Sequence, residues 1–396
     1  MRGRRLVLTF GLLTALFAAG YGVMFTMLDD FRDDYGIGPA ALGVVVATGF
    51  FSSFLAQVFL APLADRGHAR QLVYLGMLLN IVGLVGMAFG TTFLVLVAAR
   101  LVMGLGAGMA VPAVRRIVIL AEPDQLGANL GMLLSADVGG FAMGPAVSAV
   151  LAGPFGIPAP FLLIAVATVL CLPVIARVHV EETHHDDAPQ ARFAFDLLRS
   201  RRYVAAVVMG SAVFLMIGTF DALWALVLSD LRTADWIANI GITLFALPLI
   251  IFGPLGGRLA QRIGPFRLGT IGMLGGAVFM LLYGLVPSGG AMFVVAMVHA
   301  LNDGLTVSSA SVAVGLVSPV ERQAGAQGLL GGIETLVAGI TALAAGALYE
   351  GFGRTVAYTC CAIGIAMCLV AVLVLVGPSW RRRPETVEMM SAPSLH

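Results

Sequence analysis

Four charged residues stand inside long apolar stretches of this 396-residue sequence: Arg100, Asp137, Asp303 and Glu334. A buried carboxyl group without a partner either binds a proton or finds a cation. In hydrocarbon a charged side chain costs at least about 3 kcal/mol, so it marks a functional site by default. We predict that the three acids bind and release protons, with Arg100 biasing that equilibrium. For any one acid, the alternative is a structural contact between helices, and for Arg100 it is an interfacial position.

Asp303 belongs to a polar face of its apolar stretch. His299, Asn302, Asp303 and Thr306 are spaced by three or four residues, which places them on one side of a helix. Asp303 is close to the middle of that stretch, where a proton carrier is expected. We predict that His299 and Asn302 contact a substrate beside it.

Aromatic residues add candidates for an adaptable surface that binds apolar ligands. Tyr21 and Phe25 lie on one face of the first apolar stretch, and Asp221 is followed three residues later by Trp224. We predict that all four line the substrate site, with Asp221 attracting a cation. For each aromatic residue taken alone, plain packing is the alternative.

The amino-acid composition indicates which medium surrounds these residues. Apolar residues make up 59% of the chain and charged residues 11%, and the mean hydropathy is +0.97. A soluble domain has about a quarter of its residues charged, so the medium here is the lipid bilayer. The net charge of +1 gives no reason to expect a nucleic-acid partner. No metal triad, nucleophile elbow or phosphate loop occurs, so we expect no enzyme activity, no cofactor and no metal.

The apolar stretches predict an all-α polytopic membrane protein with twelve transmembrane helices, each about 20 residues or longer. The predicted spans are 6–28, 39–62, 72–90, 93–118, 126–152, 159–178, 203–228, 237–257, 268–287, 290–316, 325–349 and 355–377. We interpret 6–28 as an uncleaved helix because it is too long for a signal-peptide core.

The basic residues predict the orientation of these spans. With a cytoplasmic N-terminus, only Arg32, Arg232 and Arg354 fall on the outside, and all other arginines face the cytoplasm or lie within a span. Cytoplasmic loops retain basic residues, so both termini are predicted to be cytoplasmic. Every basic residue in the sequence is Arg and none is Lys, which we interpret as the coding bias of a GC-rich bacterium. We therefore expect a location in a bacterial cytoplasmic membrane.

The sequence repeats itself at half length. Residues 61–66 (APLADR) correspond to 257–262 (GRLAQR), and 131–137 (GMLLSAD) correspond to 328–334 (GLLGGIE). Such a parallel repeat predicts two six-helix halves around a central cavity that holds the substrate. We predict an N-terminal half at 1–178, a cytoplasmic linker at 179–202, a C-terminal half at 203–377 and a cytoplasmic tail at 378–396. In the linker, 184–187 (HHDD) are interpreted as solvated residues, with metal binding as the alternative.

Three motifs resemble those of the major facilitator superfamily, and within it the twelve-span drug:proton antiporters. Ala61-x-Leu-Ala-Asp65-Arg66-x-x-x-Arg70 is similar to the family's gating loop G-x-L-A-D-R-x-G-R-R, although Ala61, His68 and Ala69 depart from it. Asp65, Arg66 and Arg70 keep its charges, and a carboxylate among arginines can cap a neighbouring helix. The alternative is a simple basic loop on the cytoplasmic side.

The other two motifs lie within the fourth and fifth spans. Arg100-x-x-Met103-Gly104 resembles R-x-x-Q-G, with Met in place of Gln. Gly140-x-x-x-Gly144-Pro145 resembles the core of the antiporter motif, although Ser148 and Ala149 replace its following glycines. We predict that Gly140, Gly144 and Pro145 pack the helix closely against a neighbour and let it bend.

The resemblance implies a secondary transporter that works by alternating access. We expect proton-coupled efflux of small apolar or cationic compounds, as in multidrug resistance, by a monomer whose partners are substrate, protons and lipid. The first alternative is transport of a sugar, an amino acid or another metabolite, to which His299, Asn302 and Thr306 would offer hydrogen bonds. The second is a membrane sensor or a membrane enzyme.

Overall fold

The structure, a computed structural model, describes residues 2–178, 189 and 191–378. These residues form helices joined by short loops, and no strand occurs among them. Twelve of the helical segments are long and apolar enough to cross a membrane. The prediction of an all-α polytopic protein with twelve spans is therefore confirmed.

The helices follow one another with few residues between them. The α-helices are α1 (Arg2–Thr26), α2 (Leu28–Tyr35), α3 (Pro39–Phe59), α4 (Ala69–Phe89), α5 (Phe93–Ala121), α6 (Leu126–Phe155), α7 (Pro158–Ala176), α8 (Arg201–Asp230), α9 (Asp235–Ile263), α10 (Pro265–Leu285), α11 (Gly289–Thr306), α12 (Ser309–Val317), α13 (Gln323–Phe352) and α14 (Arg354–Val376). Short 3-10 helices are η1 (Ala61–Arg66), η2 (Pro123–Gln125), η4 (Ala194–Arg199) and η5 (Val320–Arg322).

Two predicted spans are interrupted in the structure. The first is broken at Met27, and the acidic helix α2 follows it. The tenth is broken between Thr306 and Ser309, where α11 gives way to α12. The Thr306 hydroxyl donates to the Asn302 carbonyl (2.8 Å), and such bonds from Ser and Thr to the preceding turn bend helices. Hydropathy does not reveal the second break, because the segments on both sides of it are apolar.

The chain forms two compact units. Unit 1 comprises 1–123, 136–194 and 320–332, and unit 2 comprises 124–135, 195–319 and 333–396. The helices α6 and α13 each begin in one unit and continue in the other. The predicted halves 1–178 and 203–377 stay a prediction, and the observed units differ from them by these exchanged helix starts. Of the predicted linker the structure describes 189 and 191–202, and of the tail only 378; positions 184–187 lie outside the described residues.

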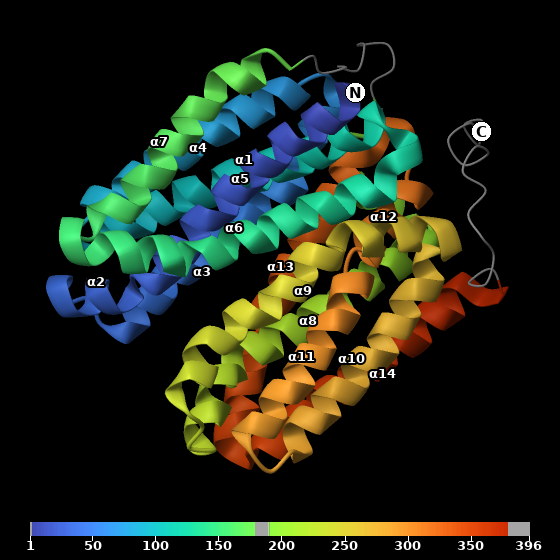
Figure 1. Cartoon of the computed structure of the whole chain (residues 1–396). Helices are drawn as coiled ribbons and strands as arrows, with labels where there is room; N and C mark the ends of the chain where they lie inside the picture. The colour runs from blue at the N-terminus through green and yellow to red at the C-terminus, as the bar shows by residue number, and fades with distance from the viewer. Residues whose placement is uncertain (1, 179–188, 190, 379–396) are drawn as a thin grey trace. The chain divides into compact units, whose positions relative to one another are not determined.

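Unit 1 is a helical bundle in which α5 packs against both α3 and α4. The helix α7 covers α4 and α1 (Figure 1). The core of unit 1 includes the buried residues Phe31, Met24 and Phe161. The turn after η1 ends at Gly67, whose φ of 84° is a left-handed conformation that glycine adopts without strain.

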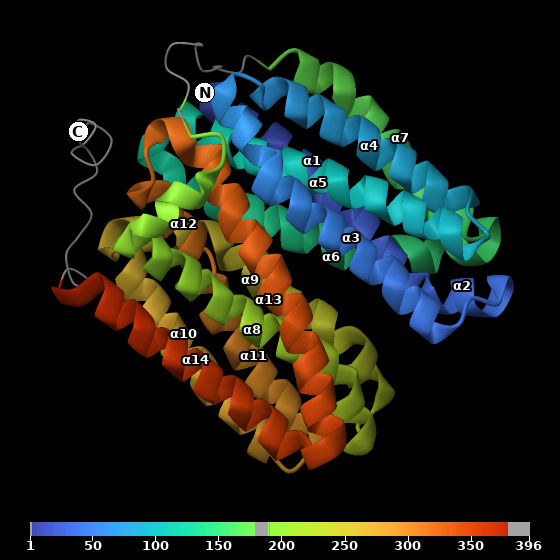
Figure 2. The same cartoon turned by 180° about the vertical axis from the view of Figure 1, so that it is seen from behind.

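Unit 2 is a second bundle, built around α8, α10 and α11. The helix α10 packs against α14 and α11, α9 packs against α11, and α14 packs against α8 (Figure 2). Its core includes Trp224, Tyr283 and Tyr358, all of which are fully buried. This unit therefore contains bulky aromatic side chains with polar groups that need partners.

Both units expose large apolar side chains on their helices. Leu94 of unit 1 is 74% exposed and Leu343 of unit 2 is 79% exposed. Apolar patches of this extent are rare on soluble monomers. They fit helices whose outer faces contact lipid rather than water.

Candidate functional site

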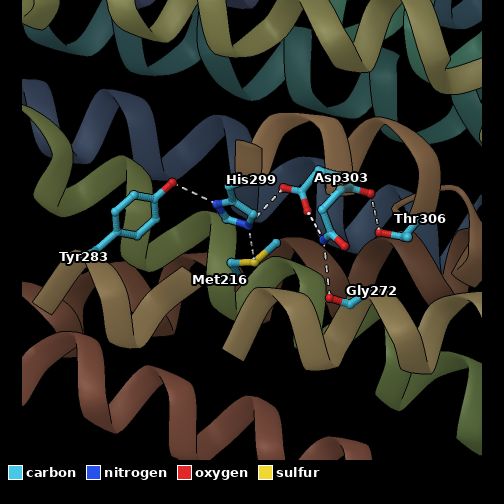
Figure 3. Close-up of polar contacts among 7 residues, drawn as sticks. Met216, Gly272, Tyr283, His299, Asp303 and Thr306 are labelled. Atoms are coloured by element: carbon cyan, nitrogen blue, oxygen red, sulfur yellow. Dashed lines mark hydrogen bonds and ion pairs between the residues drawn. The ribbon is translucent and has the colours of Figure 1, made fainter. Parts of the chain in front are cut away.

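The strongest cluster of polar side chains lies within unit 2 and is centred on Asp303 (Figure 3). Asp303 Oδ2 lies 3.4 Å from His299 Nε2, one helical turn earlier on α11. Asn302 Nδ2 donates to Asp303 Oδ1 (3.2 Å) and to the Gly272 carbonyl (3.4 Å). His299 is 1% exposed and Asp303 is 3% exposed. The predicted polar face of the tenth span is thus a hydrogen-bonded network in the interior of a bundle.

Two further helices complete this network. Tyr283 from α10 places its hydroxyl 2.9 Å from His299 Nδ1, and Met216 from α8 places its sulfur 3.0 Å from His299 Nε2. The imidazole is flanked by Phe279, whose ring stacks on it at 4.8 Å, and by Phe245 at 5.6 Å. Both nitrogens of His299 are therefore engaged within the bundle.

A small cavity adjoins Asp303. It has a volume of about 10 Å³ and is lined by Asp303 and Thr306 together with side chains from α8 and α10, such as Met209, Met216 and Met273. A volume of about 10–15 Å³ is the least that can hold a water molecule. Asp303 therefore has two polar neighbours on its helix and space for one water on its open side.

This arrangement can hold and exchange one proton. Asp303 accepts hydrogen bonds from neutral donors, and among the described residues no arginine lies within 4 Å of it. A carboxyl group in such an environment has no fixed countercharge that would keep it ionised. The hydrogen bond from Asn302 and the nearby His299 Nε2, at 3.4 Å, favour the ionised form, whereas burial favours the protonated form. The balance between them lets Asp303 bind and release a proton.

In unit 1, Arg100 lies against Tyr21. The guanidinium carbon is 4.3 Å from the centre of the Tyr21 ring, and Arg100 is fully buried. Tyr21 is the side chain with which the buried guanidinium group interacts. Arg100 thus lies in the interior of unit 1 and faces an aromatic ring rather than an acid, with an attraction typical of cation–π pairs.

The remaining predicted site residues are distributed over both units. Phe25 is half-buried in unit 1 and contacts the rings of Phe50 (6.3 Å) and Phe141 (5.9 Å). Asp137 is exposed on unit 1, and Arg115 is the charged side chain that acts on it.

In unit 2, Asp221 is exposed and Glu334 is buried. Trp224 is fully buried and stacks near Phe220, at 4.8 Å between ring centres. Phe220 in turn contacts Tyr283 at 5.6 Å. A row of aromatic rings thus links Trp224 to the network around Asp303.

Asp65 of the predicted gating loop caps the first turn of α13. Its two carboxylate oxygens accept from the backbone N–H groups of Ala324 (2.8 Å) and Gly325 (2.7 Å). Arg116 Nε of α5 lies 3.3 Å from Asp65 Oδ1, and Asp65 is 1% exposed. A helix N-terminus carries a partial positive charge and free N–H donors, so this carboxylate fastens the start of α13 to unit 1.

The repeat-related position makes a similar but neutral contact in unit 2. Gln261 corresponds to Asp65 in the half-length repeat. Gln261 Oε1 accepts from the backbone N–H of Gly127 in the first turn of α6 (2.8 Å), and its Nε2 donates to the Asp124 carbonyl (3.3 Å). The starts of α13 and α6 are thus held by two related clasps, one charged and one neutral.

The two arginines of the gating loop bind backbone carbonyls in unit 1. Arg66 donates to the Pro189 carbonyl (2.9 Å) and Arg70 donates to the Ala176 carbonyl at the end of α7 (2.9 Å). Arg70 also lies over the Tyr74 ring, 5.7 Å from its centre. These contacts join the loop to the segment that follows the sixth span.

Gly140 and Gly144 lie where α6 packs directly on α1. A Cβ atom added at Gly140 would lie 2.1 Å from the Ala15 carbonyl oxygen, and one at Gly144 would lie 2.3 Å from the Gly22 carbonyl carbon. Pro145 follows inside α6, where it removes a backbone donor. The close approach of these backbones is the packing that the glycine motif predicts.

Gly144→Ala is expected to lower the stability of the protein by about 1–3 kcal/mol, because the methyl group overpacks a contact between two backbones. Gly153→Ala, in the same helix, is the matched control: no atom lies within 4 Å of a Cβ at that position. The melting temperature of the purified protein in detergent measures both effects. Equal melting temperatures for the two variants would contradict the packing role of Gly144.

The acidic helix α2 follows the first span. Arg32 pairs with Asp29 (3.0 Å) and with Asp33 (2.8 Å). The hydrogen bond from Arg32 lowers the pKa of Asp33 below its ordinary value. Because these side chains are well exposed, their ion pairs add little stability, and we assign α2 no part in the site.

Several residues of these sites are missing from the sequence-based prediction. Tyr283 and Met216 occur singly in apolar stretches, and nothing in their spacing points to His299. The one available signal for Tyr283 is that a buried tyrosine hydroxyl needs a partner. The sequence distinguishes Arg116 from the other basic residues at the cytoplasmic ends of the spans by no signal, whereas the structure buries it beside Asp65.

The sequence has recognisable relatives. A sequence profile of the Major Facilitator Superfamily matches residues 10–234 and 222–393. The chain is 28% identical over 134 residues to the quinolone resistance protein NorA of Staphylococcus aureus (strain MRSA252), an alignment that covers 34% of each protein. It is 23% identical over 282 residues to the multidrug resistance protein MdtG of Proteus mirabilis, covering 67% of this chain and 69% of that protein. The match to NorA thus spans about a third of that relative's length.

Solved structures share the fold. The proton:xylose symporter XylE, solved with 6-bromo-6-deoxy-D-glucose bound, superposes with a TM-score of 0.80. The superposition covers 97% of this chain and 98% of that chain, at 14% sequence identity. A likeness at that level of identity establishes the architecture and leaves the transported compound open.

Proposed function

This chain belongs to the major facilitator superfamily, and we propose that it exports small apolar or cationic compounds in exchange for protons across a bacterial cytoplasmic membrane. Proteins of this family are transporters and not enzymes. Asp303 carries the assignment of proton coupling, because it is a buried acid with neutral donors and space for one water. The names of two relatives, a quinolone resistance protein and a multidrug resistance protein, support the class of substrate.

Asp303 acts in this proposal as the group that takes up a proton from one side of the membrane and releases it on the other. The change between a charged and a neutral carboxyl group changes the cost of keeping the interior of unit 2 closed. Asp137 and Glu334 are proposed to assist, Asp137 through its interaction with Arg115. Arg100 is proposed to supply a fixed positive charge in unit 1 that opposes protonation of nearby groups.

On each unit, taken by itself, the proposed substrate-contacting surface consists of aromatic or acidic side chains that the bundle leaves partly accessible. Tyr21 and Phe25 are half-buried and Asp221 is exposed. Aromatic faces bind flat apolar molecules and cations without fixed hydrogen-bond geometry. Trp224 and His299 are buried, and we propose that they support this surface from within unit 2 rather than contact the substrate.

Alternating access requires the two units to rearrange around a substrate. The helices α6 and α13 pass from one unit to the other, and each clasp holds the start of such a helix within the unit where that helix begins. We propose that Asp65 and Gln261 stabilise one of the two states. Arg66 and Arg70 anchor the same loop.

Vesicles that contain the purified protein test the proposed exchange. Imposing a proton gradient across the membrane is expected to drive a fluorescent quinolone against its own gradient, with protons moving in the opposite direction. Collapsing the gradient with a protonophore should reduce accumulation to the level of protein-free vesicles. Quinolone transport that is indifferent to the protonophore would contradict proton coupling.

Transport of a polar metabolite is the second candidate, and the fold shared with a xylose symporter is compatible with it. The hydrogen-bonding groups that would serve a sugar are, however, used within unit 2. Asn302 donates to Gly272 and Asp303, Thr306 donates to Asn302, and both His299 nitrogens are engaged. This occupancy favours the apolar or cationic substrate. Labelled xylose in the same vesicles should therefore not be transported.

A further inference from the structure

Tyr283 reaches the Asp303 network from a different helix and has no assigned role. Its hydroxyl lies 2.9 Å from His299 Nδ1, and its side chain is fully buried. Among the described residues its hydroxyl bonds to His299 and makes no hydrogen bond to Asp303, so a hydrogen-bonded influence on the carboxyl group passes through the imidazole. Which nitrogen of His299 carries the hydrogen therefore decides whether the Tyr283 hydroxyl donates to Nδ1 or accepts from it.

The neighbours of His299 determine which nitrogen carries the proton when Asp303 is ionised. Nε2 faces Asp303 Oδ2 at 3.4 Å and the Met216 sulfur at 3.0 Å. An ionised carboxylate and a thioether accept hydrogen bonds and cannot donate them. Nε2 must therefore carry a hydrogen, and in the neutral ring Nδ1 is then the acceptor. The Tyr283 hydroxyl is the donor that Nδ1 needs.

Aromatic rings pack around the imidazole. Phe279 stacks on the ring at 4.8 Å, Phe245 meets it edge-on at 5.6 Å, and Tyr283 lies 5.7 Å away. Close packing against these rings restricts rotation of the imidazole. Its orientation is thus fixed by packing, whereas its tautomer is free to respond to the hydrogen bond at Nδ1.

We propose that Tyr283 is a positioning residue for Asp303: its hydroxyl donates to His299 Nδ1 and so keeps the proton on Nε2, which donates to the ionised carboxylate. This inference rests on the proposed function only in that Asp303 is taken to bind and release a proton. The tyrosine acts at a distance, in the way that partners of a metal-bound histidine set its tautomer.

The proposal also gives the proton on Asp303 a direction. With a hydrogen already on Nε2, His299 cannot accept from a protonated carboxyl group. The new O–H bond must therefore turn toward the cavity of about 10 Å³, where one water can accept it. The proton joins the carboxyl group from that water and leaves by the same water, while Tyr283 and His299 keep their own hydrogens.

Apart from His299 and Tyr283, no titratable group among the described residues acts on Asp303. His299 is the one on its own helix, and Tyr283 is the one behind it on α10. The other side chains that line the cavity, from α8, α10, α12 and α14, are uncharged. The effect of a substitution at Tyr283 on the titration of Asp303 can therefore be measured without interference from a nearby charge.

Infrared spectroscopy of the full chain in lipid tests the proposal. The band of the protonated Asp303 carboxyl group is identified by its absence in Asp303→Asn, and its intensity is followed between about pH 4 and about pH 10. In Tyr283→Phe the midpoint of this titration is expected to move upward by about one pH unit. Without the tyrosine hydroxyl, His299 Nδ1 is free to carry the hydrogen, so that Nε2 can accept from the protonated carboxyl group and stabilise the protonated form. A midpoint that is unchanged in Tyr283→Phe overturns the proposal.

Tyr358→Phe is the matched control. The Tyr358 ring lies 5.6 Å from that of Tyr283, it is equally buried, and its hydroxyl has no partner among the described residues. The titration midpoint of Asp303 in Tyr358→Phe should equal that in the wild type. A similar upward shift in both variants would show a general effect of removing a buried hydroxyl and would overturn the specific role of Tyr283.

A double substitution tests whether the effect passes through His299. In His299→Gln the side-chain amide offers a donor without tautomers, so adding Tyr283→Phe should produce no further shift. A shift that persists in the His299→Gln background overturns the proposed route, and so does a carboxyl band that fails to titrate in the wild type. Because the midpoint is measured without substrate, a failure of proton-coupled export leaves this inference standing, and the two outcomes are distinguishable.

Discussion

Asp303→Asn is expected to reduce proton-driven accumulation of a quinolone in vesicles to the level of protein-free vesicles. The asparagine keeps the shape of the side chain, and its carbonyl can still accept from Asn302, but it cannot bind or release a proton in this range. The protein should remain folded, since one weakened hydrogen bond costs only about 1 kcal/mol. Exchange of labelled for unlabelled quinolone at equal pH should persist, because a permanently neutral carrier can still alternate between its two states.

Asp29→Asn is the control for this substitution. Asp29 is an acid of the exposed helix α2, with 80% of its side chain accessible and a single ion pair to Arg32. Such exposed pairs contribute at most about 1 kcal/mol, so the variant should accumulate quinolone like the wild type. Undiminished quinolone accumulation by Asp303→Asn would contradict the proposal that Asp303 binds the transported proton. Asp137 and Glu334 would then be the next acids to substitute.

Asp65→Ala is expected to cause the second large loss. It removes the acceptor of two backbone N–H groups at the start of α13 and the carboxylate beside the buried Arg116. Breaking a buried, hydrogen-bonded charge pair costs about 3–5 kcal/mol. If the clasp stabilises one transport state, a loss of about 3 kcal/mol shifts the balance between states by about 100-fold. We expect a lower melting temperature together with a loss of transport of tenfold or more.

Gln261→Ala gives the comparison within the same molecule. Its clasp is neutral and partly exposed, with one bond of 2.8 Å to the first turn of α6, so its removal should cost only about 1 kcal/mol. The melting temperature and the quinolone transport rate measure both variants. Equal losses in the two variants would contradict the idea that charge and burial make the Asp65 clasp the stronger one.

The fold was largely predictable because lipid imposes a simple rule. A spanning segment must satisfy its own backbone and therefore be helical, so hydropathy alone located twelve spans close to the observed helices. The breaks at Met27 and at Thr306–Ser309 were not predictable in this way, since they depend on local bonds such as Thr306 to Asn302. The sequence also did not predict that α6 and α13 each begin in one unit and continue in the other. That arrangement depends on contacts between residues more than a hundred positions apart.

The site was predictable only where helical spacing carried information. The positions of His299, Asn302 and Asp303 follow from their separation by three and four residues, and the structure joins them in one network. Their surroundings do not follow from spacing. Tyr283 and Met216 come from other helices, and His299 is so enclosed that its predicted contact with substrate gives way, in our proposal, to a role beside the proton.

The two clasps also bear on how the chain is made. Asp65 is synthesised 259 residues before its partner Ala324, and Gly127 is synthesised 134 residues before Gln261. Closing such long loops is slow, because entropy is lost before the contact forms. Unit 1 is therefore complete only after residues 320–332 have been synthesised, and until then the Asp65 carboxylate lacks its two backbone donors. A chain that ends before residue 324 would lack both backbone donors that Asp65 binds in the folded protein.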